Sequence, residues 1–439
     1  MPAVTADFAI DRASFGQFWQ YADRRAGRLP LRTSRTPSEA DAAATLYREA
    51  REARDRFLCH HVEKVYATLT GGFSRFVRVE DLVLDAAEAF PGLVPSRAHL
   101  AAEADRPLRE KEGLETDQGI LIARVLAHPR CGTHLCHAML LPRPEAAGAL
   151  AKFAAEGLVD LGAARVERHG RAAHLLTGNP RYLNAEDQAT IAAVEIAVDV
   201  ATLDPDTEIA VLRGQPVRNA KYAGRRIFGS GINLTHLYRG TIPFMWYLQR
   251  DLGFVHKFLR GVATPDTPPD DVNGAGVEKL WIAAVEGWAI GGHCQILLTM
   301  DAVLAAADAY MTLPARKEGI IPGAANLRLP RFTGDRLARQ LIQAERRLDC
   351  DSAEGRLICD EIVPAAEMDA AIDRTVAVLT SAGVVGAIGN RRAFRVAAEP
   401  LDLFRRYFAV YAREQAACHF SEALIHNLER NWGAQSRAR

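Results

Sequence analysis

The sequence carries no excess charge of either sign, and this absence limits what it can bind. Lys plus Arg and Asp plus Glu each number 54 among 439 residues, so the formal net charge is zero. A protein without a net field has no long-range attraction to nucleic acid or anionic lipid. Non-specific binding to polyanions is therefore a poor hypothesis for its function.

Long apolar runs and a leader-like segment are also missing. The longest weakly polar run, Thr375 to Gly389, is shorter than the roughly 20 residues that a membrane-spanning helix needs. Residues 1–16 contain acidic side chains and no basic segment before an apolar stretch, unlike a secretory signal. We expect a soluble protein with a cytoplasmic location.

Cysteines are few and scattered. They number seven, in a chain too large to need cross-links, so reduced thiols are expected. Four side chains of metal-ligand type do cluster, at Cys131, His134, Cys136 and His137. No second pair follows at the spacing of a zinc finger, and the segment also fits a helix entering a core. We expect its role to be structural.

The first third of the sequence predicts helices. Residues 38–70 place apolar side chains at helical spacing, and Ser38 is a suitable N-cap. Further helices are expected at residues 79–90 and 117–141, and another within 142–162, which starts at a proline pair and ends in glycine. This pattern indicates a helical N-terminal domain over residues 1–162.

From Ala164 onward, strand-like and helical segments alternate. The polar loop 263–276 is rich in proline and glycine and is expected on the surface. Strands separated by helices favour βαβ units with a largely parallel sheet. The segments are two short strands around His169-Gly170, a helix at 185–203, a strand at 207–214, a glycine-rich loop at 228–234 and a buried strand at 279–287.

Several motifs after Ala164 occur in the order and spacing of the crotonase, or enoyl-CoA hydratase/isomerase, superfamily. Among them are "FGSGINL", "EGWAIGGHCQILL", "GIIPGAANLRLPRF" and "HFSEALIHNLERNW". The resemblance implies an α/β fold with a crotonase-like ββα spiral core over residues 163–335. It also implies a helical C-terminal segment, residues 336–439, that assembles a homotrimer or homohexamer or closes the CoA site.

The resemblance implies an acyl-CoA thioester held by two backbone N–H groups. By motif position these belong to Ile232, next to Gly231, and to Gly292. Two such dipoles in a dry pocket stabilise a thioester enolate by several kcal/mol, and glycine at 292 lets the backbone approach the ligand. The matching loop implies that Arg181, Tyr182 and Leu183 follow the CoA nucleotide, although Arg181 in a surface turn is the alternative.

The sequence departs from the hydratases of the superfamily at both acid/base positions. The first glutamate is replaced by Gln295, and the second by Ala315. Concerted hydration then has no proton donor. Glu318, three residues further, is nearly one helical turn away, so a shifted replacement stays open as an alternative.

A stabilised enolate that lacks these carboxylates can still react with molecular oxygen. The resulting peroxide can attack the thioester and expel CoA. The long helical extension and the two loops resemble the superfamily's cofactor-independent dioxygenases, which use neither metal nor organic cofactor. That resemblance implies conversion of (3,5-dihydroxyphenyl)acetyl-CoA and O2 to 3,5-dihydroxyphenylglyoxylate and free CoA, a step in antibiotic biosynthesis.

The same resemblance assigns Glu186, Arg250 and Gln295 to the dihydroxyphenyl ring or to ordering the site. A neutral amide suits a phenol hydroxyl because it donates and accepts without adding charge to an apolar pocket. The alternatives are a first-turn carboxylate for Glu186, a solvated helix-end cation for Arg250 and a passive replacement at Gln295. His293 is expected to be a hydrogen-bonded core histidine rather than a base.

Two further alternatives stay open at this stage. One is another enolate reaction, an isomerase or thioesterase with Glu318 or Glu186 as base. The other is a noncatalytic acyl-CoA binder. The N-terminal extension is expected to pack against the core, covering the acyl end and excluding water, or else to serve as an assembly surface.

Overall fold

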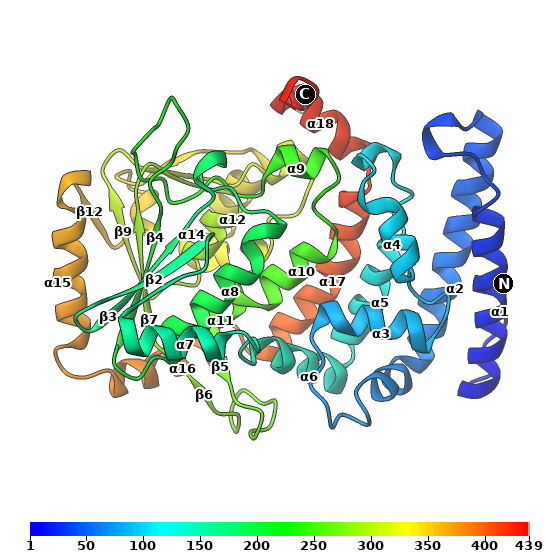
Figure 1. Cartoon of the computed structure of the whole chain (residues 1–439), viewed down its shortest axis with the longest axis horizontal. Helices are drawn as coiled ribbons and strands as arrows, with labels where there is room; N and C mark the ends of the chain where they lie inside the picture. Colours follow the sequence, from blue (N-terminus) through cyan, green and yellow to red (C-terminus); the bar gives the residue numbers. More distant parts are fainter. Residues whose placement is uncertain (438–439) are drawn as a thin grey trace.

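The computed structural model describes residues 1–437 and places a helical N-terminal part beside a sheet-containing core (Figure 1). The expected N-terminal helices are present. They are α1 (Phe8–Ala26), α2 (Pro37–Leu69), α3 (Val79–Ala89), α4 (Arg97–Ala104), α5 (Thr116–Ala127), α6 (Pro129–Leu140) and α7 (Ala146–Glu156).

Helix α2 begins earlier than expected, because Thr36 and not Ser38 is its N-cap. The Thr36 side chain accepts a hydrogen bond from the Glu39 N–H, and the Glu39 carboxylate accepts one from the Thr36 N–H at 2.8 Å. Pro37 fits the first helical position, where no N–H is required.

Helix α6 carries the Cys/His cluster and packs it into the core, as expected. Cys131 and Cys136 are fully buried, and burial raises the pKa of both thiols to about 12. His134 bonds Tyr66 and Phe73, so its ring nitrogens serve the packing of α6 against α2. Within residues 1–437, no group of three or more His, Cys, Asp or Glu is placed to hold a metal ion.

The core contains a seven-stranded sheet in the order β1-β2-β3-β4-β7-β9-β12. Its first three strands form an antiparallel meander, and every neighbouring pair from β3 to β12 is parallel. The largely parallel sheet is therefore confirmed. The strands are β1 (Leu158–Asp160), β2 (Ala164–His169), β3 (Ala172–Thr177), β4 (Ile209–Gly214), β7 (Leu280–Val285), β9 (Ala302–Ala306) and β12 (Glu361–Val363).

The chain winds through repeated ββα turns, which confirms the ββα spiral. In each turn one strand joins the large sheet, the next joins a small sheet of order β11-β10-β8, and a helix follows. An earlier turn has the same plan, because Gly229 bridges Ala289 of β8 just before α9 (Leu234–Tyr238). The other members are β8 (Trp288–Ile290), α12 (Gly292–Leu297), β10 (Tyr310–Thr312), α13 (Ala315–Glu318) and β11 (Leu348–Asp349).

The large sheet includes strands that lie outside residues 163–335, the expected core, in the sequence. Strand β1 precedes residue 163, and β12 follows residue 335, which lies within α14 (Ala325–Gln343) beside the non-helical Gly334. The division into three segments stays a prediction. The loop between the short strands β5 (Val262–Ala263) and β6 (Gly276–Val277) is on the surface, where Val272 is 80% exposed.

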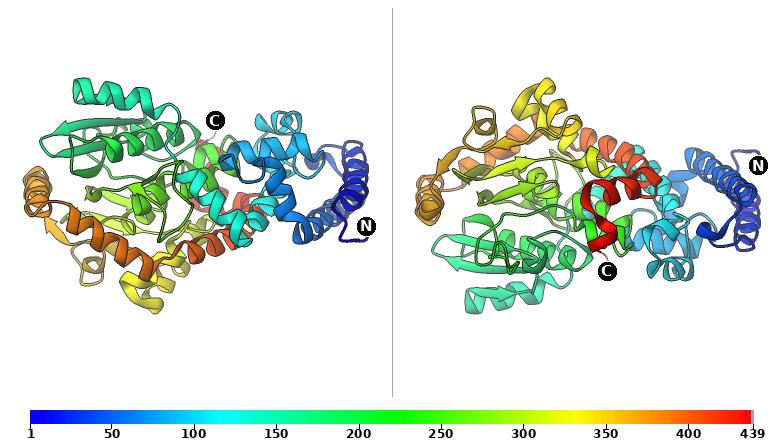
Figure 2. Two further views of the ribbon diagram at one scale, coloured as in Figure 1. Left: turned by 90° about the horizontal axis from the view of Figure 1, so that it is seen from below. Right: turned by 90° about the horizontal axis from the view of Figure 1, so that it is seen from above.

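The C-terminal helices return to the N-terminal part. Helix α17 (Leu401–His419) leaves the sheet region and packs along α5 (Figures 1 and 2). The contact is so close that a Cβ added to Gly119 would lie 2.8 Å from Ala416 Cβ. The neighbouring helices are α15 (Met368–Thr380), α16 (Val385–Ala398), α18 (Glu422–Trp432) and α19 (Ala434–Arg437).

A buried charge cluster also joins the two parts. Glu195 of α8 (Gln188–Leu203) binds Arg78 at 2.8 Å and Lys257 at 2.9 Å, and Lys257 binds Asp199 at 2.7 Å. Removing one member of such a buried ion pair is strongly destabilising, because the remaining charge is buried without an opposite charge.

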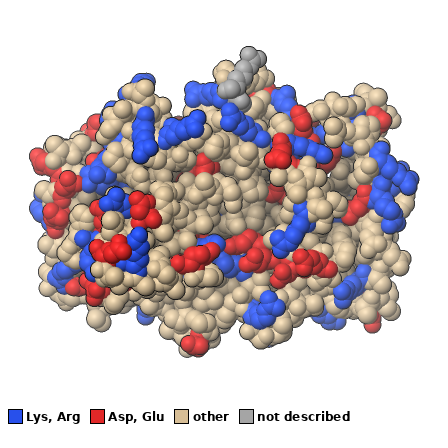
Figure 3. Space-filling view, viewed as in Figure 1, with Lys and Arg blue, Asp and Glu red and all other residues tan. Residues whose placement is uncertain are grey.

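Basic and acidic side chains are interspersed on the face shown in Figure 3. Among residues 1–437, no single helix has the length and apolar character to cross a membrane. One pair bent by 92°, Ala365–Thr380 with Val385–Ala398, meets those two requirements when taken together.

Candidate active site

Two successive ββα turns bring the N–H groups of Ile232 and Gly292 to one pocket. Ile232 forms a parallel bridge with Glu186, in which Glu186 donates to Gly231 O at 2.7 Å and accepts from Asn233 N–H at 2.7 Å. In such a bridge the N–H of the central residue points to the other side. The Ile232 N–H is therefore left for another acceptor.

Gly292 is the first residue of α12, where an N–H has no acceptor within the helix. The preceding Gly291 N–H is taken by Thr312 O at 2.9 Å. The two loops touch, since a Cβ added to Gly231 would lie 3.5 Å from Gly292 N and 3.0 Å from Ile290 O. Together they form a pair of donors suited to a single oxyanion.

Position 292 requires glycine because a buried ion pair leaves no room for a side chain there. The close approach of a ligand to the backbone is the other reason expected from the motif. A Cβ there would lie 2.6 Å from Glu186 Oε2 and 2.8 Å from Arg250 Nη2. Both side chains are fixed, so the backbone of α12 can begin here only without a side chain. The packing against the ion pair is visible only in the fold.

Arg250 is the centre of this cluster and is 2% exposed. From α10 (Met245–Leu252), its Nε lies 3.1 and 3.0 Å from the two carboxylate oxygens of Glu186. Nη1 donates to Asp251 at 2.8 Å and to Gln295 Oε1 at 3.2 Å, and Nη2 donates to Gly292 O at 2.8 Å. Burial lowers its pKa, but Glu186 and Asp251 outweigh this and raise it, so the guanidinium stays charged.

These contacts exclude two of the alternatives. Arg250 is not a solvated helix-end cation, because it is buried and paired. Glu186 is not a first-turn carboxylate, because it precedes Asp187, the N-cap of α8, and pairs with Arg250 instead. Their contact with the ring of a substrate stays a prediction.

His293 is a hydrogen-bonded core histidine, as expected. Its Nδ1 accepts the Gly231 N–H at 3.1 Å, and burial lowers its pKa, which favours the neutral ring. A Cβ on Gly229 would overlap this ring, so glycine is required there. His293 thus holds the loop that presents the Ile232 N–H.

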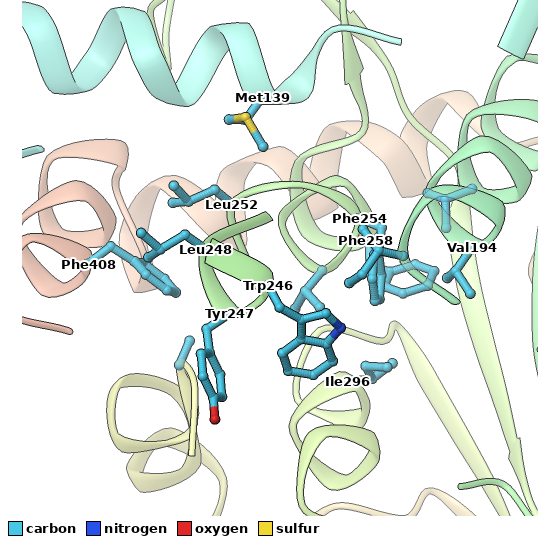
Figure 4. Packing of buried hydrophobic residues seen from close by; sticks show 14 of the residues in the cluster. Met139, Val194, Trp246, Tyr247, Leu248, Leu252, Phe254, Phe258, Ile296 and Phe408 are labelled. Carbon is cyan, nitrogen blue, oxygen red and sulfur yellow. The ribbon is translucent and has the colours of Figure 1, made fainter. Parts of the chain in front are cut away.

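The pocket itself is lined by the donor pair, by Gln295 and by aromatic side chains. Helix α10 turns Trp246 and Tyr247 to one side while Leu248 and Leu252 face Met139 and Phe408 (Figure 4). Its lining is Ser230, Gly231, Ile232, Trp246, Tyr247, Arg250, Asp251, Ile290, Gly291, Gly292, Gln295, Ala315, Glu318, Ile320, Ile321, Pro322, Gly323 and Tyr411.

The N-terminal helices do not line this pocket: no described residue of the lining precedes Ser230. They pack behind it instead, through α5 against α17 and α3 against α10. Helix α17 brings Tyr411 to the pocket, and Tyr407 of the same helix donates to Gly323 O. The N-terminal helices thus reach the pocket only through other helices, and a role in covering the acyl end stays a prediction.

The sequence did not single out Asp251, Trp246, Tyr247 or Tyr411. Asp251 directly follows Arg250 in the sequence "QRD", and this adjacency is the only sequence feature that could have indicated it. The tyrosines and the tryptophan reach the pocket through helix packing, and no motif marks them.

The segment expected along the CoA nucleotide lies next to the donor loop. Ser230 Oγ donates to Leu183 O at 2.8 Å, and Leu183 has a positive φ of 56°. Arg181 is exposed and lies over the Tyr182 ring, 5.4 Å from its centroid. Binding of CoA phosphates by Arg181 stays a prediction.

Known proteins share both the sequence and the fold. A (3,5-dihydroxyphenyl)acetyl-CoA 1,2-dioxygenase of Amycolatopsis orientalis is 44% identical over 416 residues, which cover 94% of each chain. Residues 275–385 match the enoyl-CoA hydratase/isomerase family. The chain belongs to the crotonase superfamily.

Solved structures of the crotonase superfamily confirm the fold. An enoyl-CoA hydratase/isomerase from Xanthobacter autotrophicus Py2 is 22% identical, with a TM-score of 0.51 over 63% of this chain and 96% of its own. An enoyl-CoA hydratase from Mycobacterium avium subsp. paratuberculosis K-10 is also 22% identical, with a TM-score of 0.50 over 62% of this chain and 99% of its own. At this identity the likeness concerns the fold alone.

Proposed function

We propose that this chain is a dioxygenase that converts (3,5-dihydroxyphenyl)acetyl-CoA and O2 to 3,5-dihydroxyphenylglyoxylate and free CoA. The observation that carries the proposal is the relative from Amycolatopsis orientalis, which is named a (3,5-dihydroxyphenyl)acetyl-CoA 1,2-dioxygenase and matches over 94% of both chains. The N-terminal helices are included in that match, whereas the hydratases share the core.

The pocket supports an enolate reaction. Two N–H donors, from Ile232 and Gly292, stabilise negative charge on a thioester oxygen as it develops. At the two hydratase positions the side chains are Gln295 and Ala315, neither of which transfers a proton. The enolate is thus held for a reaction partner other than water.

Oxygen is the partner that fits this chemistry. The carbanion is oxidised by O2 at the α carbon, and the peroxide attacks the thioester carbonyl and displaces CoA. Both oxygen atoms remain in the product. The aryl ring assists by delocalising charge from the α carbon, so the reaction as proposed uses no metal or organic cofactor.

Gln295 is suited to recognise a ring hydroxyl. Its Oε1 is held by Arg250, while its amide nitrogen has no hydrogen-bond acceptor among residues 1–437 and belongs to the pocket lining. A free donor on a fixed side chain can bind a phenol oxygen without bringing a charge into the pocket.

The test is simultaneous measurement of O2 uptake and CoA release with (3,5-dihydroxyphenyl)acetyl-CoA in the presence of a chelator. The proposal requires one O2 for each CoA released and activity that survives chelation. CoA release without O2 uptake would indicate a thioesterase instead, and binding with neither would indicate an acyl-CoA binder. The homotrimer or homohexamer and the cytoplasmic location stay predictions.

A further inference from the structure

Glu318 places in the pocket with the proposed enolate donors a carboxyl group that has no partner among residues 1–437. It is the last residue of α13 and lines the pocket together with Ala315, one turn earlier on the same helix face. No hydrogen bond or ion pair to its side chain occurs in the part of the chain that the structure describes. A carboxyl left unpaired inside a pocket costs stability and so calls for a functional reason.

The other titratable groups around the pocket are engaged or unsuited to accept a proton. Asp251 and Glu186 both bind Arg250. His293 Nδ1 is occupied by the Gly231 N–H. Burial raises the pKa of Tyr247 and of Tyr411 well above the ordinary value, so both phenols stay protonated.

We propose that Glu318 is the catalytic base of this enzyme, and that it removes both α protons by giving the first one to the departing CoA thiolate. This inference rests on the proposed oxygen-dependent reaction and names the group that the site otherwise lacks. The hydratases carry their second glutamate at the position of Ala315, and Glu318 lies one helical turn beyond that position.

The balance of the reaction requires a group that acts twice. Glu318 first takes one α proton, and the electron pair passes into the enolate. O2 then forms a C–O bond at the α carbon, taking up two electrons as a peroxide anion. The peroxide oxygen attacks the thioester carbon, the C–S bond breaks, and the CoA thiolate accepts the proton held by Glu318.

The second half of the reaction again requires a base, because the second α proton must be removed. The four-membered peroxide ring loses its remaining α proton to Glu318. The C–H electron pair becomes the C=O bond, the O–O bond breaks, and the carboxylate of the arylglyoxylate leaves with both oxygen atoms. Two protons leave the α carbon in all, one bound finally to CoA and one passed from Glu318 to solvent.

The environment of Glu318 suits this exchange. Desolvation, aided by the negative charge of Glu345 and opposed by Lys317, raises the pKa of Glu318 to about 8. An ordinary thiol has a pKa of about 8.5, so a proton passes between Glu318 and CoA with little cost. Tyr247 of α10 lines the same pocket as Glu318, and α18 meets α13 through the uncharged Leu424, Asn427 and Asn431.

The decisive measurement is hydrogen exchange at the α carbon without oxygen. Wild-type protein incubated with arylacetyl-CoA in D2O under argon should incorporate deuterium, measured by mass spectrometry. Glu318→Gln should slow this exchange by about 10²- to 10³-fold, and Glu318→Asp should recover part of it. Exchange by Glu318→Gln within about threefold of wild type would overturn the assignment.

Glu345→Gln is the matched control, because it removes a nearby carboxylate that does not line the pocket. It should keep full exchange at high pH and shift the pH profile of exchange to lower pH, since it removes a charge that raises the pKa of Glu318. An unshifted profile would count against Glu318 as the titrating base. Melting curves show whether the variants are folded. O2 uptake by the wild type tests the proposed function separately. If O2 uptake is absent while deuterium exchange depends on Glu318, the dioxygenase proposal fails and the assignment of Glu318 as the base stands.

Discussion

The Nε of Arg250 lies 3.1 and 3.0 Å from the two carboxylate oxygens of Glu186, although 64 residues separate them. Both side chains lie against Gly292, but only Arg250 lines the pocket, whereas Glu186 lines a neighbouring cavity. A backbone donor of the site is therefore positioned by side chains from two other elements. The consequences can be measured.

Gly292→Ala should cost activity by about 10²- to 10³-fold, the loss typical of one oxyanion donor. The new Cβ would lie 2.6 Å from Glu186 Oε2, so the start of α12 must move. Steady-state kinetics check this. Gly148→Ala in α7 is the control, because no atom counted among residues 1–437 lies within 4 Å of the added Cβ, and it should leave kcat unchanged. A similar loss in both variants would contradict this account of the site.

Glu186→Gln should destabilise the protein by about 3–5 kcal/mol, because it leaves Arg250 buried with reduced compensation. Urea denaturation measures the loss. Glu208→Gln removes an exposed partner of Arg171 and should leave stability nearly unchanged, because solvent screens an exposed ion pair. Equal effects from the two changes would mean that the buried pair contributes no more than a surface one.

Gln295→Ala should impair turnover of (3,5-dihydroxyphenyl)acetyl-CoA about tenfold more than turnover of phenylacetyl-CoA, the value of one hydrogen bond to a neutral group. The loss is specific because the substitution removes the amide N–H of Gln295 and leaves the backbone N–H groups of Ile232 and Gly292 in place. Comparison of kcat/KM for both substrates is the measurement. Equal losses on the two substrates would refute a role in ring recognition.

Glu318→Gln should raise thermal stability at high pH. The pKa of Glu318 is about 8 in the folded protein against an ordinary 4.5, so the folded state holds a proton that the unfolded chain releases. The wild type therefore loses stability as pH rises from about 4.5 to about 8, and the variant does not. The Tm difference should be small near pH 5 and largest above pH 8; a difference independent of pH would be contrary to this account.

Gly119→Ala should weaken the support that the N-terminal helices give to the pocket. Its Cβ would lie 2.8 Å from Ala416 Cβ and 2.9 Å from Ala412 O, both on α17, which carries Tyr411. We expect a loss of about 1–3 kcal/mol in stability and a fall in kcat/KM. Gly16→Ala in α1, with open space around it, should cause neither.

Local patterns in the sequence were enough for much of the fold, while the donor role of Ile232 and Gly292 stays a prediction. Helical spacing located α2, and strand–helix alternation indicated the parallel sheet. The glycine-rich motifs marked Ile232 and Gly292, because a backbone donor needs a particular turn and a turn leaves a local signature. The absence of carboxylates at Gln295 and Ala315 could likewise be read directly, and it pointed away from hydration.

Tertiary structure decided what depends on residues far apart in the chain. How the helices pack decides the pairing of Glu186 with Arg250 and the position of Tyr411 of α17. It also leaves the Glu318 carboxyl without a partner in the described part of the chain, residues 1–437. Packing energy is summed over many distant contacts, each weak by itself, so no short segment encodes it. Glu318 shows the difference plainly: its position in the sequence allowed a role, but its chemistry depends on which groups surround its carboxyl and which do not.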